Sequence, residues 1–161
     1  MRELFIILII LAGLFALIQV FRVKDTFSRV INGVFAVALG VTMIPVPAVA
    51  IDGYYLFLIG CLLVILYTFS DNSFGTVKKS LLIVMAGIQL FATLFWLQQW
   101  PGADILSLAC LITVGIYVFV ITKEIRTYQI EIGFLTVLMV DGLIKSIIAL
   151  SEFLGGSEPI G

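Results

Sequence analysis

Six long apolar runs, separated by short polar stretches, restrict the folds that this chain can adopt. A helix needs about 20 mostly apolar residues to cross a bilayer, with a tolerated range of about 17–25. Within lipid every backbone N–H and C=O must be paired inside the protein, which a helix achieves by itself. The runs cover residues 4–21, 30–44, 54–69, 80–100, 105–122 and 130–154, and the third could begin as early as Val49. They predict an all-α integral membrane bundle of about six transmembrane helices with short loops, and a single transmembrane domain over residues 1–161.

The composition excludes several classes of protein. Apolar residues make up 62% of the chain and charged residues 12%, against about 45–50% and about 25% in soluble domains. A net charge of −1 without a basic patch argues against nucleic-acid binding. Histidine is absent, which removes the commonest general base and the commonest metal ligand. Cys61 and Cys110 lie inside apolar runs without a CxxC motif, so we expect buried free thiols.

Basic residues predict how the chain is oriented. Lys and Arg of membrane proteins concentrate in short cytoplasmic loops, whereas acidic residues carry little topological signal. Seven of the nine basic residues follow the first, third and fifth runs: Arg22, Lys24, Arg29, Lys78, Lys79, Lys123 and Arg126. Six crossings of the cell (inner) membrane then place both termini on the extracytoplasmic side. The aromatic residues Tyr54, Tyr55, Trp96 and Trp100 fall at the opposite, outer boundary, as an interfacial belt does.

A modest internal match indicates a repeated helical hairpin. With the chain shifted by 54 residues, Gly33 falls on Gly87, Ala38 on Ala92, Pro47 on Pro101 and Ala48 on Gly102. Each copy has a glycine-bearing helix, an outer turn with proline and a small residue, and a returning helix. Glycine allows helix backbones to approach closely, and proline ends a helix where its missing N–H faces water. Duplication of a hairpin and the general pattern of any membrane hairpin both explain this match.

The second hairpin resembles the bacterial acid-resistance membrane protein family over residues 81–126, LLIVMAGIQLFATLFWLQQWPGADILSLACLITVGIYVFVITKEIR. Members of that family are built from such glycine–helix–proline–helix hairpins. With the first hairpin, which resembles it less closely, roughly half of the chain is covered, and the motif consists mostly of Gly, Pro and Leu. The chain departs from the pattern at Pro45-Val46-Pro47 and in the charged final run. The resemblance implies a six-helix envelope protein with a stress-related role and no known catalytic residues.

The last apolar run, residues 130–154, carries a stripe of ionisable residues. Asp141 lies near the middle of the bilayer, where an Asp or a Lys costs about 2.5–3.5 kcal/mol on insertion scales. Lys145 follows four residues later and can touch Asp141 on the same helix face. Glu152 lies a further seven residues on, on nearly the same stripe, while the opposite face carries Leu, Ile and Val.

Three interpretations of this stripe stay open. It lines an aqueous pathway or proton relay, it forms a self-neutralising ion pair with Lys145 extending toward Glu152, or it meets a complementary charge on a partner protein. No other run offers an opposing charge, and the nearest polar candidates are Gln19, Asn32 and Gln89. Gln89, in the middle of the fourth run, favours an interhelical hydrogen bond over a ligand contact. Asn32, at the start of the second run, favours a helix cap.

No sequence feature indicates catalysis. A nucleophile would lack a base, no phosphate-binding loop is present, and we expect neither a cofactor nor a metal site. We therefore expect a small membrane protein without a catalytic site, an envelope protein or accessory subunit that packs with a membrane protein partner or with itself in the lipid bilayer. The alternative is a compact proton- or ion-coupled transporter or channel that uses Asp141 and Lys145. The candidate polar site consists of Asp141, Lys145, Glu152 and Gln89.

Overall fold

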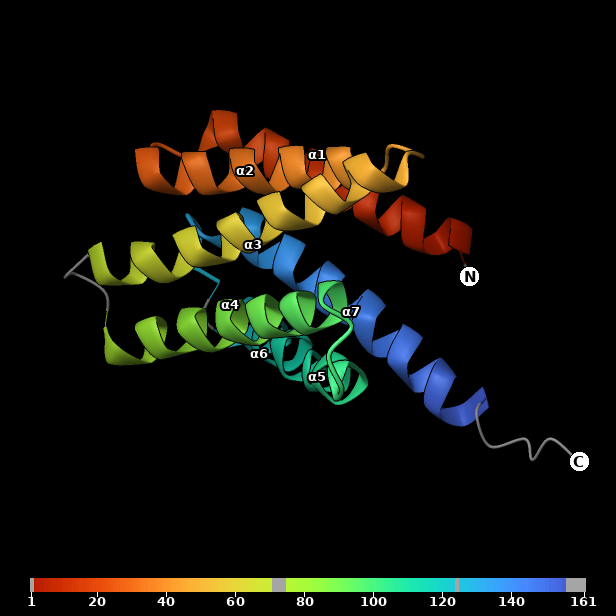
Figure 1. The fold of residues 1–161 in the computed structure, drawn as a ribbon. Coiled ribbons are helices and arrows are strands. Elements are labelled where there is room, and N and C mark those ends of the chain that lie inside the picture. The colour runs from red at the N-terminus through yellow and green to blue at the C-terminus, as the bar shows by residue number, and fades with distance from the viewer. Residues whose placement is uncertain (1, 71–74, 124, 156–161) are drawn as a thin grey trace, which may run out of the picture.

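The computed structural model describes residues 2–70, 75–123 and 125–155, and their regular structure is entirely helical (Figure 1). Five stretches are long and apolar enough to cross a membrane, one of them formed by α5 and α6 together, and α2 is a shorter apolar helix. The predicted all-α bundle is confirmed, and its helix lengths and composition are those of a membrane protein. The elements are α1 (Arg2–Arg22), α2 (Thr26–Thr42), α3 (Pro47–Ser70), α4 (Thr76–Leu97), α5 (Ala103–Ala109), α6 (Leu111–Lys123) and α7 (Ile132–Gly155).

Helices α2 and α3 begin earlier than the apolar runs 30–44 and 54–69 predict. The Asp25 carboxylate accepts a hydrogen bond of 2.6 Å from the backbone N–H of Ser28, and this cap starts α2 at Thr26. Arg29 therefore belongs to the helix rather than to the preceding loop. Pro47 is the first residue of α3, a position where the helix needs no N–H, so the helix begins before Tyr54 and before the alternative start at Val49.

The fifth apolar run, 105–122, lies in one stretch long enough to cross a membrane, but this stretch consists of two consecutive helices, α5 and α6. The helix is interrupted at Cys110, which lies between α5 and α6. The Cys110 carbonyl accepts two hydrogen bonds from Thr113, one from the backbone N–H at 3.0 Å and one from the Oγ1 hydroxyl at 2.6 Å. A hydrogen bond between residues three apart, in place of four, tightens the turn. The Thr113 hydroxyl, which donates to the same carbonyl, competes with the regular helical hydrogen bond. The break therefore has a local polar cause that the apolar pattern does not show.

Helix α7 packs against most of the other helices. In Figure 1, α1, α2 and α3 lie together on one side of the bundle, α4, α5 and α6 lie on the other, and α7 crosses behind them. It contacts α1, α2, α4, α5 and α6. In the most apolar stretch of α7, 50% of the residues are buried, whereas the share in the corresponding stretch of α1 is 17%. The polar stripe predicted on the last run therefore lies on the most enclosed of the long helices.

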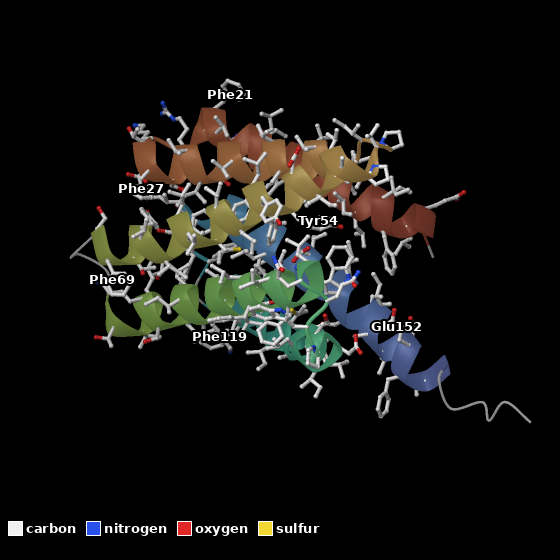
Figure 2. All side chains as sticks on the ribbon, in the orientation of Figure 1. Phe21, Phe27, Tyr54, Phe69, Phe119 and Glu152 are labelled. Atoms are coloured by element: carbon white, nitrogen blue, oxygen red, sulfur yellow. The ribbon has the colours of Figure 1, made fainter. Side chains whose placement is uncertain are left out.

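The two ends of the bundle differ in charge and in packing. The basic end, where α1, α3 and α6 finish, carries Arg22, Lys24, Lys78, Lys79 and Lys123, and the acidic end, where α1 begins and α7 finishes, carries Glu3, Asp52, Asp104 and Glu152. Large side chains with essentially no solvent exposure fill the half of the bundle toward the basic end, among them Leu82, Phe134 and Leu135. Large apolar side chains also point outward from the long helices, as a lipid-facing surface requires (Figure 2).

The two hairpins of the internal match are not built alike. The turn between α4 and α5 holds Gln99 at φ 52° and Gly102 at φ 90°, whereas no residue of the turn between α2 and α3 has a positive φ. Neither of the two aligned glycines, Gly33 and Gly87, lies where another helix approaches closely. A Cβ added at Gly87 would meet nothing within 4 Å, and at Gly33 the nearest atom would be 3.9 Å away.

Helix α3 lies close to α2 at Gly53 and at Gly60, and the contact at Gly60 leads to a stability prediction. A Cβ at Gly60 would lie 2.7–3.0 Å from three ring atoms of Phe35, a side chain with no solvent exposure. Because the ring is fully enclosed and cannot move away, we expect Gly60→Ala to lower the free energy of unfolding by about 1–3 kcal/mol. Gly87→Ala is the matched control. Thermal unfolding in detergent measures both variants, and equal midpoints would contradict the prediction.

Candidate functional site

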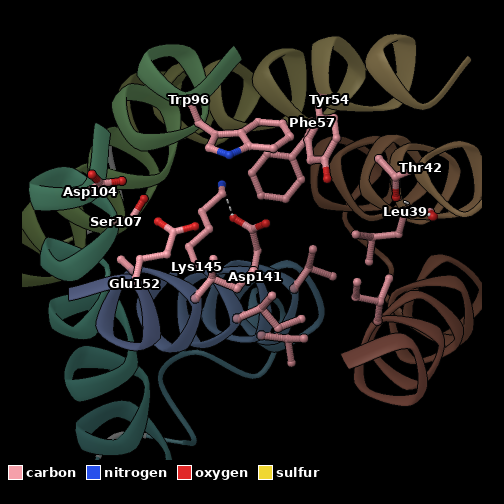
Figure 3. A pocket seen from close by; sticks show the side chains of 16 residues that line it. Leu39, Thr42, Tyr54, Phe57, Trp96, Asp104, Ser107, Asp141, Lys145 and Glu152 are labelled. Carbon is pink, nitrogen blue, oxygen red and sulfur yellow. Dashed lines mark hydrogen bonds and ion pairs between the residues drawn. The ribbon is translucent and has the colours of Figure 1, made fainter. Parts of the chain in front are cut away.

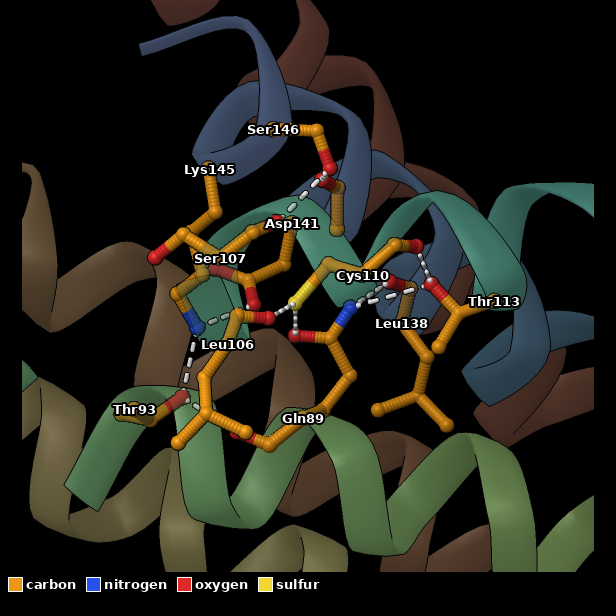
Figure 4. A network of polar contacts seen from close by, with 11 residues as sticks. Gln89, Thr93, Leu106, Ser107, Cys110, Thr113, Leu138, Asp141, Lys145 and Ser146 are labelled. Carbon is orange, nitrogen blue, oxygen red and sulfur yellow. Dashed lines mark hydrogen bonds and ion pairs between the residues drawn. The ribbon is translucent and has the colours of Figure 1, made fainter. Parts of the chain in front are cut away.

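Asp141 and Lys145 form an ion pair inside the bundle. The Lys145 Nζ lies 2.5 Å from Asp141 Oδ2 and also donates a hydrogen bond of 2.5 Å to Thr93 Oγ1 on α4. The side chains retain 11% exposure for Lys145 and 16% for Asp141. The predicted contact between these two residues is confirmed. Lys145 does not extend toward Glu152, because its ammonium group is held by partners on α7 and α4 (Figure 3, Figure 4).

The pair borders a cavity of about 150 Å³ at the acidic end of the bundle (Figure 3). Every helix except α6 contributes to its wall. The lining residues that carry polar groups or rings are Thr42, Tyr54, Phe57, Trp96, Asp104, Ser107, Asp141, Lys145 and Glu152. Aliphatic side chains of α1, α2 and α7 complete it. We call this cavity the α7 pocket.

Aromatic rings form one wall of the α7 pocket. The Tyr54 and Trp96 ring centroids are 5.0 Å apart, and the Lys145 Nζ lies 5.1 Å from the centroid of the Phe57 ring. In Figure 3 the three rings gather over the ends of the Asp141 and Lys145 side chains. Tyr54 and Trp96, predicted as members of an interfacial belt, thus also line this cavity.

Carboxylates lie at the mouth of the pocket. Glu152 lines it, as its place on the α7 stripe suggests, and its side chain is exposed. Asp104, in the first turn of α5, lines the same cavity and is also exposed. Sequence reasoning missed Asp104 because it stands just before the fifth apolar run, where an acidic residue is typical of a solvated loop. Its position at the same predicted membrane boundary as Glu152 was the available signal.

Gln89 lies behind the pocket and connects three helices (Figure 4). Its Nε2 donates to Thr113 Oγ1 at 3.2 Å and to the Leu138 carbonyl at 2.8 Å. The predicted interhelical hydrogen bond is confirmed, and Gln89 does not line the cavity. Thr93 links it to the ion pair, because the Thr93 hydroxyl donates to the Gln89 carbonyl and accepts from Lys145. Gln89 therefore positions α4 against α6 and α7.

A second buried ion pair lies at the basic end, and the sequence pattern did not predict it. Glu131 is fully buried, and its Oε1 lies 2.8 Å from Lys78 Nζ and accepts a 3.1 Å hydrogen bond from the Tyr67 hydroxyl. Its Oε2 has no hydrogen-bond partner among the described residues. Neither residue interrupts the middle of an apolar run. An acidic or basic residue at a run boundary predicts a solvated loop, so the pattern gave no sign of the pair.

Asn32 does not cap α2, contrary to the prediction. Asp25 has that position, and Asn32 lies inside the helix without solvent exposure. Its side-chain amide donates to the Ser28 carbonyl at 2.8 Å, while its Oδ1 accepts no hydrogen bond from any described residue. Cys61 and Cys110 are buried and free, as predicted. Over residues 2–70, 75–123 and 125–155 no three metal-binding side chains come together.

Comparisons with known proteins give no relative for this chain. No family model matches it, and neither the curated proteins nor the solved structures contain a significant match. The resemblance to the acid-resistance family therefore stays a prediction. The fold and the site by themselves define a helical bundle of membrane-spanning composition with a charged pocket inside it.

Proposed function

We propose that this protein is a compact membrane transporter that binds a small solute in the α7 pocket and uses Asp141 and Lys145 to couple its movement to protons or ions. One observation carries the proposal: the charged stripe of α7 faces a cavity built by six of the seven helices, rather than lipid. Ionisable residues placed in a membrane span at such a cavity are the usual mark of a substrate or ion pathway.

The geometry favours this function over a purely structural ion pair or a partner contact. Asp141 and Lys145 neutralise each other at 2.5 Å, so neither needs a charge from another protein. A pair that served packing alone would be enclosed by side chains, whereas this pair borders empty space and keeps part of its surface exposed. The pair is therefore positioned to exchange partners when a solute enters.

The packing also indicates the direction from which a solute enters. The α7 pocket lies at the acidic end, and the buried side chains of Leu82, Phe134 and Leu135 close the bundle toward the basic end. With basic loops on the cytoplasmic side and both termini outside, as we propose for the cell membrane, this arrangement is an outward-facing state. Transport then requires α7 and the two helix groups beside it to shift, as in alternating access.

A flux assay tests the proposal. The protein is reconstituted in liposomes that contain a pH-sensitive dye, and an imposed potassium diffusion potential drives protons across the membrane. Asp141→Asn is expected to reduce the protein-dependent flux by about tenfold or more, since the titratable group of the pathway is lost. Asp52→Asn, an exposed acidic residue at the same end that does not line the pocket, is expected to keep it.

A second experiment distinguishes a transporter from an accessory subunit. Purification from the native membrane in mild detergent, followed by mass spectrometry, shows what remains bound to the chain. A stoichiometric companion together with unchanged flux in Asp141→Asn would refute the transporter and favour an accessory subunit. A lone chain or homo-oligomer whose flux depends on Asp141 would support the transporter.

A further inference from the structure

We infer that the α7 pocket selects small organic cations, with an ammonium or quaternary ammonium group next to an apolar body. The inference rests on the proposed function and adds the chemical class of the solute to it. Three features of the pocket carry it, namely its charge, its aromatic wall and the way in which Lys145 is already held.

The charge of the pocket favours a cation. Three carboxylates line it, those of Asp104, Asp141 and Glu152, against the single ammonium of Lys145. Lys145 pairs with Asp141, and the ion pairs among the described residues include neither Asp104 nor Glu152. Two carboxylates at the mouth thus have no counter-ion among the residues that the structure describes. An anionic solute would meet an uncompensated negative field there, whereas a cation would be attracted.

The aromatic wall favours an organic cation over a bare metal ion. Tyr54 and Trp96 present neighbouring rings to the cavity, together with the Phe57 ring. Ring faces attract ammonium groups through their quadrupole, Trp most strongly, whereas a hard metal ion requires several oxygen ligands. The aliphatic side chains of Ile144 and Ile148 complete the wall and suit the apolar body of an organic cation.

Lys145 shows that this wall accepts an ammonium group. Its Nζ lies 5.1 Å from the Phe57 ring centroid, within the range of about 6 Å over which cation–π attraction acts. A second cation cannot occupy that point, because Lys145 holds it through Asp141 and Thr93. The remaining place lies between the Tyr54 and Trp96 rings and the carboxylates of Asp104 and Glu152, where Figure 3 shows these groups on the rim of one cavity.

Fluorescence of Trp96 provides the binding assay. The chain has two tryptophans, and Trp100 packs against Phe95 outside the pocket lining, so Trp100→Phe leaves Trp96 as the single reporter. The probe is benzyltrimethylammonium, and its uncharged isostere neopentylbenzene is the matched ligand control. We expect the cation to bind about tenfold more tightly than the isostere, a difference that a cation–π contact and attraction to the carboxylates supply together.

Two exposed carboxylates provide the matched protein variants. Asp104→Asn combined with Glu152→Gln is expected to weaken binding of the cation by about tenfold and to leave binding of the isostere unchanged, because only the charge attraction is removed. Asp52→Asn, outside the pocket, is expected to change neither. Glu3→Gln is a second control. The four substituted residues, Glu3, Asp52, Asp104 and Glu152, are all exposed, so the substitutions do not endanger folding.

The outcomes separate this inference from the proposed function. Equal binding of cation and isostere, or no binding of either, would overturn the choice of solute class, and the flux through Asp141 would still decide whether the protein is a transporter. A cation preference that the Asp104 and Glu152 variants do not weaken would also overturn it. A preference that depends on both carboxylates supports it.

Discussion

Lys78→Met is expected to lower the free energy of unfolding by about 3–5 kcal/mol, the usual cost of removing one partner from a buried ion pair. Glu131 has no solvent exposure, and Lys78 lies 2.8 Å from its Oε1. Without Lys78 the Glu131 carboxylate keeps the Tyr67 hydroxyl as a hydrogen-bond donor, but it loses the positive charge that pairs with it. Chemical or thermal unfolding in detergent measures the loss. Lys79→Met is the matched control, because this neighbouring lysine forms no ion pair with a described residue.

A double variant shows whether the effect comes from the uncompensated charge. Glu131→Gln removes the charge and keeps an oxygen for the Tyr67 hydroxyl, so Lys78→Met with Glu131→Gln is expected to recover most of the stability lost in Lys78→Met alone. If the two losses simply add, the buried pair is not the cause and the prediction is wrong. The lysine stem would then contribute through packing, including its contact with the Tyr128 ring.

Features that depend on local spacing could be predicted from the sequence. Six apolar runs gave the helical bundle, because membrane thickness fixes the length of a spanning helix. Asp141 and Lys145 meet because residues four apart share a helix face, whatever the rest of the chain does. Gln89 was expected to bond between helices because a polar group in mid-span has no water to pair with.

Features that depend on tertiary packing could not be predicted in this way. Lys78 and Glu131 are 53 residues apart, and nothing in the composition near either one indicates that α4 and the turn before α7 bring them together. The break at Cys110 arises from a side-chain hydroxyl two turns into an otherwise regular apolar run. Asp104 lines the pocket only because the turn before α5 places that helix beside the mouth of the cavity. A pocket formed by six helices has no signature in any one of them.

Neutralising Asp141 and Lys145 together is expected to preserve the fold and abolish flux. Lys145→Met alone leaves the Asp141 carboxylate without its ion-pair partner inside the bundle, and we expect it to cost about 3 kcal/mol, in line with buried pairs and with intramembrane charges. Asp141→Asn with Lys145→Met removes both charges, so its stability is expected to lie within about 1 kcal/mol of the unmodified protein. Unfolding in detergent compares the three proteins.

The doubly neutral variant separates a structural pair from a functional one. Because its fold is retained, loss of flux in the liposome assay cannot be attributed to misfolding, as it could for either single substitution. The matched control is Lys78→Met with Glu131→Gln, which neutralises the ion pair between α4 and the turn before α7, outside the pocket. Flux that survives in the control and disappears in the variant of Asp141 and Lys145 places the pathway at the α7 pocket. Flux that survives in both would show that Asp141 and Lys145 neutralise each other for stability alone.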